Sequence, residues 1–180
     1  MLKRILIVVA LSGLASACDN TASRLDQEAR ICERALEIGV LELAEEHCQS
    51  ALGEPDDDVL APQDRSERLY RLASIKRQLA KYAEAVELLS QSLVLEQTLS
   101  GSDSPQVASR RLEMSLILAG QGKWPEGAQL LEQVVPAASS LDEKERASLV
   151  NVLQHYAVQL QKSQHIEEAS RLQAAAASLE

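Results

Sequence analysis

The chain has 180 residues, with 27 acidic and 18 basic side chains, a formal net charge of −9 and no phenylalanine. This acidic balance argues against binding nucleic acid or anionic lipid through charge, because both need a basic face. The length suits one ordinary domain, and with so few aromatic residues its core must be built from Leu, Ala, Ile and Val, which favours helices.

The chain begins with a predicted secretory signal over residues 1–17. Lys3 and Arg4 precede an apolar stretch at 5–11, and small residues follow up to Cys18, which is the layout of a cleaved export signal. The apolar stretch is shorter than the roughly 20 residues that a membrane span needs. We therefore expect the signal to be removed, and the remainder to be an exported soluble domain.

Residues 14–17, Leu-Ala-Ser-Ala, resemble the lipobox of bacterial lipoproteins and stand directly before Cys18. In that family the signal is cut before the Cys, which then carries acyl chains, and two or more chains form a stable anchor. The resemblance implies lipidation of Cys18, a tether at 18–24 and a periplasmic position in a bacterial cell envelope. Asp19 resembles an inner-membrane retention signal, which favours the inner over the outer membrane. The alternative is ordinary cleavage after Ala17, leaving a free terminal Cys.

An internal repeat occupies the remainder of the chain. Tyr82, Trp124 and Ile166 stand in equivalent segments 42 residues apart, and a weaker copy at Leu41 precedes Tyr82 by 41 residues. Apolar residues recur at helical spacing before and after a short break in each copy. Because one helix hairpin cannot cover its own apolar face, several must stack. The predicted units cover residues 25–52, 65–99, 105–138 and 142–180, with an acidic linker at 53–64.

At these positions the chain resembles the tetratricopeptide repeat (TPR) family. That family places a small residue in the first helix, a large residue at the turn and a small residue early in the second helix. The matching positions are Ala44, Ala73, Tyr82, Ala85, Ser115, Trp124, Gly127, Ala157, Ile166 and Ala169. The resemblance implies an all-α fold, a right-handed α-α superhelix (TPR-like solenoid) of about four hairpins. A HEAT-like array, which has a similar period, is the alternative.

The long period and one linker resemble the TPR variant of kinesin light chains. Residues 101–108 read Gly-Ser-Asp-Ser-Pro-Gln-Val-Ala, which matches the linker pattern of that variant. From the residues alone, Gly101 can end a helix, Ser104 can cap the next one and Pro105 suits its first turn. A helix boundary is therefore predicted here.

Cys32 and Cys48 remain as a pair if Cys18 is lipidated. In the resembled hairpin their two places face each other, which implies a disulfide that would persist in an oxidising compartment. Closing a loop of about 16 residues could stabilise the domain by roughly 3 kcal/mol. The alternative is that both are buried free thiols.

The sequence shows no constellation that would support catalysis. We find no nucleophile with a base, no phosphate-binding Gly loop and no paired-carboxylate site. The three adjacent Asp residues of the linker lack the alternating ligands of a calcium loop. Cys32, His47 and Cys48 are an incomplete zinc set. We therefore expect no enzyme activity, no metal and no cofactor.

The resemblance implies a scaffold that binds a protein or peptide in a concave groove lined by the first helix of each unit. At any single position a merely solvated helix face is the alternative interpretation. A membrane-anchored adaptor is the leading hypothesis, with a protein partner and no nucleic acid. A structural lipoprotein that forms a homodimer through an uncapped C-terminal repeat is the rival. The candidate groove residues are Tyr70, Ser74, Arg77, Leu112, Leu116, Asn151, Gln154, Val158 and Gln161.

Overall fold

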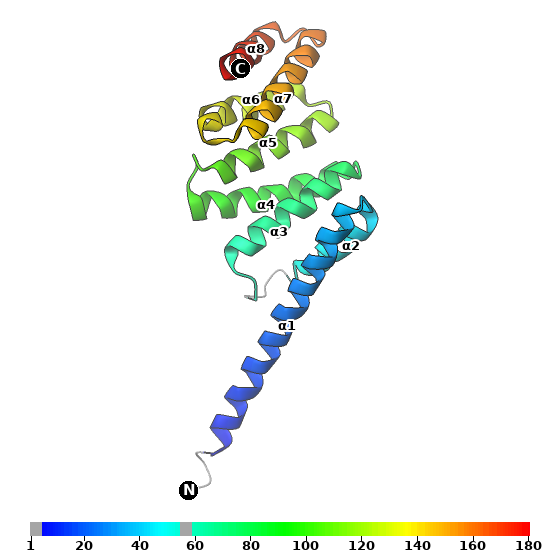
Figure 1. The fold of residues 1–180 in the computed structure, drawn as a ribbon, viewed down its shortest axis with the longest axis vertical. Helices are drawn as coiled ribbons and strands as arrows, with labels where there is room; N and C mark the ends of the chain where they lie inside the picture. Colours follow the sequence, from blue (N-terminus) through cyan, green and yellow to red (C-terminus); the bar gives the residue numbers. More distant parts are fainter. Residues whose placement is uncertain (1–4, 55–58) are drawn as a thin grey trace.

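The computed structural model describes residues 5–54 and 59–180, except for the side chains of residues 5–19 and of Ser140. Within those ranges the chain folds into α-helices and one 3-10 helix, with no strand, which confirms the all-α prediction (Figure 1). The helices pair into four successive hairpins. Their bounds are α1 Ile5–Glu37, α2 Leu41–Ala51, α3 Pro62–Gln78, α4 Tyr82–Ser100, α5 Pro105–Gly120, α6 Trp124–Val134, η1 Val135–Ser140, α7 Glu143–Lys162 and α8 Ile166–Leu179.

Every hairpin turns through one residue in the left-handed region of backbone conformation. The φ angles are 74° at Gly39, 58° at Ala80, 73° at Gly122 and 65° at Gln164. The residue after each turn donates its amide to a carbonyl five residues earlier, as Lys81 does to Lys76 at 2.8 Å, which closes the end of the first helix. The turns recur at the period of the sequence repeat, so the repeat is one structural unit used four times.

The second helix of each hairpin begins at the large residue of the repeat, and in the second and third units that residue contacts the next unit. A Cβ at Gly120 in α5 would overlap the ring of Tyr82, the first residue of α4. Trp124 packs edge-to-face on Tyr156 of α7, with ring centroids 5.1 Å apart. Ile166 begins α8 and is 57% exposed.

The small positions of the repeat lie where helices cross closely. Ala73, Ser115 and Ala157 in the first helices are fully buried, as are Ala44, Ala85 and Ala169 in the second helices. Gly127 is also buried, and a Cβ there would meet the ring of Tyr156. Around these crossings the core divides into three apolar clusters, the largest of which joins α5 to α8.

Cys32 and Cys48 form a disulfide that joins α1 to α2, with their Cα atoms 5.2 Å apart. Both are buried, at 0% and 4% exposure. At the other boundary predicted from the residues, Gly101 has a φ of 83° after α4. Ser104 caps α5 by accepting from the amide of Val107 at 3.2 Å.

The expected leader and the linker are covered only in part. Residues 1–4 of the signal, residues 55–58 of the linker and the side chain of Cys18 lie outside what the structure describes. The segment at 18–24, expected as a tether, is helical and continuous with α1. Among the described residues no helix has both the length and the apolar character that a bilayer crossing requires. Signal cleavage and lipidation stay predictions.

Candidate functional site

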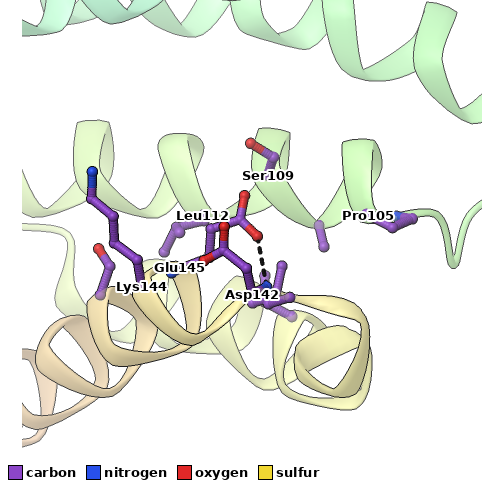
Figure 2. A pocket seen from close by; sticks show the side chains of 10 residues that line it. Pro105, Ser109, Leu112, Asp142, Lys144 and Glu145 are labelled. Carbon is purple, nitrogen blue, oxygen red and sulfur yellow. Dashed lines mark hydrogen bonds between the residues drawn. The ribbon is translucent and has the colours of Figure 1, made fainter.

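The candidate site lies along the first helices of the second, third and fourth units. α3 contacts α5 directly. α5 and α7 are in contact where Tyr156 donates to the carbonyl of Ser115, and a pocket lies between α5 and the start of α7 (Figure 2). The candidate groove residues are therefore divided between a closed junction and an open one.

A buried arginine closes the junction between α3 and α5. Arg110 is 5% exposed, and its guanidinium lies 4.1 Å from the centroid of the Tyr70 ring. It also donates to Glu67 at 2.8 Å, while the hydroxyls of Tyr70 and Ser109 lie 3.3 Å apart. The Tyr70 ring is thus occupied by contacts between units, and it is not free to form a ligand pocket.

Further polar groups complete this junction. Ser66, which is fully buried, donates to Glu96 at 3.0 Å, and Arg110 donates to Ser92 at 3.3 Å. The candidate groove residue Arg77 donates to the carboxylate of Glu113 at 2.7 Å. The sequence analysis did not identify this network, because its members lie 18 to 43 residues apart and no local pattern marks them as partners.

Pro136 accounts for the different geometry between α5 and α7. It lacks an amide hydrogen and its ring clashes with a continuing α-helix, so α6 ends at Val134 and a 3-10 turn follows to residue 140. The second helix of this unit has 11 residues, against 19 in α4. The chain then enters α7 beside α5, and a pocket remains between α5 and the first turns of α7.

The pocket in that space has a volume of about 460 Å³, which is within the range of small-ligand sites. Leu112, a predicted groove residue, supplies part of its apolar wall. The sequence analysis missed the other lining residues, although Pro136 was a signal that the second helix stops early. They are Pro105, Ala108, Ser109, Val134, Leu141, Asp142, Lys144, Glu145 and Ser148.

The acidic side of the pocket is held by a capping box at the start of α7. Asp142 accepts from the amide of Glu145 at 2.8 Å, and Glu145 accepts from the amide of Asp142 at 3.0 Å (Figure 2). Such reciprocal bonds satisfy two amides at the helix end. They fix both carboxylates at the rim of the pocket.

The remaining candidate residues lie outside the pocket. Asn151 and Gln154 line a separate hollow with Leu179 and Glu180 at the C-terminal end, where Gln154 donates to Glu180 at 2.9 Å. One repeat earlier, their equivalents are Ser109 and Leu112 of the pocket. Two other candidates, Ser74 and Leu116, are half-buried, and Val158 and Gln161 are exposed.

The junction between the first two units is also electrostatic. Lys76 is 7% exposed and contacts the carboxylates of Glu45, at 2.6 Å, and of Glu84. Hydrogen bonds from Lys76 and Lys81 lower the pKa of Glu45. Burial opposes charge on Lys76, but its bonds to Glu45 and Glu84 outweigh burial and raise the pKa of the amine. The junction therefore favours the charged form of both groups.

No cluster of three His, Cys, Asp or Glu side chains in the described part of the chain is placed to hold a metal ion. Tyr156 is the most strongly shifted titratable group, since burial raises its pKa. Its hydroxyl donates to the carbonyl of Ser115. Burial in the core explains this shift, so Tyr156 is not taken as a functional group. The clearest candidate for function is the pocket between α5 and α7.

Comparison with known proteins identifies the fold. No protein-family model and no curated protein matches the sequence. Among solved structures, BtubC (BKLC) from P. vanneervenii is 15% identical with a TM-score of 0.65 over 88% of this chain and 63% of its own. The chain thus spans less than two thirds of BtubC.

Two further structures show the same likeness. The TPR-like repeats of a putative kinesin light chain from Podospora anserina are 22% identical, with a TM-score of 0.65 over 87% of this chain and 75% of that one. MamA is 14% identical, with a TM-score of 0.64 over 87% and 78%. The fold is that of a TPR-like repeat protein, which confirms what the resemblance at the repeat residues implied.

Proposed function

We propose that this chain is a lipid-anchored adaptor, which uses the face formed by α5 and α7 to bind a segment of a protein partner. The single observation that carries the binding role is the pocket between these helices, with Leu112 in its wall. TPR-like neighbours support a protein-interaction scaffold in general.

Position-specific photo-cross-linking in intact cells tests the binding role. A photoreactive residue at Ser148, which lines the pocket and is exposed, should trap a discrete partner. The matched control carries the same residue at Gln129, which is exposed on α6. Equal trapping from both positions, or none from Ser148, would show that this face is not the binding surface.

The anchoring role rests on the lipobox-like residues before Cys18 and on the predicted export signal. It places the repeats on the periplasmic side of a bacterial inner membrane, with the outer membrane as the second choice. Growth with an alkyne-tagged fatty acid should label the wild-type chain and leave a Cys18→Ala variant unlabelled. Recovery of unlabelled wild-type chain in the soluble periplasmic fraction would show ordinary cleavage instead.

A homodimer through the C-terminal end is the second candidate. Ile166 favours it, because this residue is 57% exposed where its equivalents contact a following unit. The rest of α8 is less favourable, since its other exposed residues are small or polar: Glu167, Ser170, Arg171, Gln173, Ala174, Ala177 and Ser178. Sedimentation of residues 19–180 decides the matter. A dimer that Ile166→Glu converts to monomer supports this candidate, and a wild-type monomer excludes it.

A further inference from the structure

The pocket between α5 and α7 has two chemically different sides. Ala108 and Val134 are buried at 2% and 1% exposure, and together with Leu112 and Leu141 they form an apolar wall. Asp142 and Glu145 line the same pocket from the start of α7, and both are exposed, so they form its acidic rim. The pocket can therefore contact an apolar group through its wall and a charged group through its rim at the same time.

The rim carries an excess of negative charge. Lys144 contributes one positive charge to the lining, against two from the carboxylates of Asp142 and Glu145. The whole chain has a net charge of −9. Complementary charge steers association and disfavours partners of the same sign, so an acidic peptide is a poor fit for this rim.

The capping box holds the two carboxylates of the rim in fixed positions. Each carboxylate uses one oxygen to accept a backbone amide, so neither can rotate away without leaving an amide at the helix end unpaired. A carboxylate has further acceptor sites after making one such bond. Both groups can thus accept from a cation at the mouth of the pocket.

We infer that the pocket binds a peptide segment in which an aliphatic side chain stands next to an arginine or lysine. The aliphatic side chain enters between α5 and α7 against Leu112. The neighbouring cation pairs with Asp142 and Glu145 at the rim. This inference rests on the proposed function and specifies the chemistry of the partner.

The test uses the full chain in detergent and fluorescein-labelled peptide pools that differ only in a central pair. The pairs are Leu-Arg, Leu-Glu and Ser-Arg. We expect the Leu-Arg pool to bind about threefold or more tighter than the Leu-Glu pool, as for an exposed ion pair. The preference should shrink in high salt, which screens exposed charges. Equal or tighter binding of the Leu-Glu pool would overturn the inference.

Two variants assign any preference to this pocket. Asp142→Asn with Glu145→Gln keeps the capping acceptors and removes both charges, so it should abolish the preference for Arg over Glu. Leu112→Asn should abolish the preference for Leu over Ser. The control, Glu87→Gln with Glu167→Gln, removes the same charge from exposed positions elsewhere and should keep both preferences. Circular dichroism checks that each variant is folded.

The outcomes separate this inference from the proposed function. If Ser148 traps a partner and the rim variant binds every pool as the wild type does, the adaptor role stands and the charge assignment is wrong. If Ser148 traps no partner, the adaptor role fails. A Leu-Arg preference that the control loses as fully as the rim variant would also refute the inference, because it would then come from overall charge.

Discussion

At the scale of single residues, each of the four hairpin turns needs one residue in the left-handed conformation. Only two of the turns have a glycine there, Gly39 and Gly122. Ala80 and Gln164 adopt φ angles of 58° and 65°, which cost non-glycine residues roughly 1–2 kcal/mol. Gln164→Gly should therefore raise the free energy of unfolding by up to about 1 kcal/mol after its entropic cost. Urea denaturation measures this change. Gly122→Ala is the reciprocal variant and should lower stability because of its φ of 73°. No neighbouring atom lies within 4 Å of the added Cβ, so backbone strain alone would cause the loss.

Gly127 and Tyr156 are a second residue-scale pair. A Cβ at Gly127 would lie 2.7 Å from two ring carbons of Tyr156 and closer still to its hydroxyl. We expect Gly127→Ala to destabilise the fold by about 1–3 kcal/mol, as overpacking does. The cost should be smaller in a Tyr156→Phe background, since the hydroxyl is then absent. Thermal unfolding in a double-mutant cycle tests the coupling, and additive losses would show that the clash is relieved in another way.

At the scale of helices, the charged pairs between units determine how stability responds to pH. Hydrogen bonds from Lys76 and Lys81 lower the pKa of Glu45 in the folded state below its ordinary value of 4.5. Its contribution is therefore present above that value and is lost as the pH falls through the lower folded-state pKa. Glu45→Gln should cost roughly 1–3 kcal/mol at neutral pH and much less in acid. Urea unfolding at several pH values checks this, and a constant loss would disprove the assignment.

These same helices show how far the sequence could be interpreted alone. The 42-residue spacing of Tyr82, Trp124 and Ile166 predicted where the second helices begin, because the same packing position recurs in each unit. Arg110 could not be predicted as buried, since its partners come from α3 and α4 and only the folded structure brings them together. Tyr70 was assigned to the groove because the sequence does not show that Arg110 packs on its ring. The pocket depends on Pro136, whose local effect was predictable but whose effect on the distance to α7 was not.

For the whole molecule, the two ends of the stack should respond differently to acid. Glu45, whose pKa is lowered by Lys76 and Lys81, holds the first two units together through its ion pairs with these two lysines. The largest apolar cluster holds the last two units. We expect the helical circular dichroism signal to begin falling at a higher pH than the fluorescence change of Trp124, the single tryptophan, which packs on that cluster. Coincident transitions would show that the stack unfolds as one cooperative body.

The long first helix has a mechanical consequence. α1 projects from the stack as a rod (Figure 1), and it continues without a break from position 18 to Leu25, the first buried side chain that the structure describes. Seven residues of α-helix span about 10 Å. An acyl group on Cys18 would therefore be joined to the repeats by a rigid helix and not by a flexible linker. The bilayer would set both the height and the tilt at which the repeats meet another molecule.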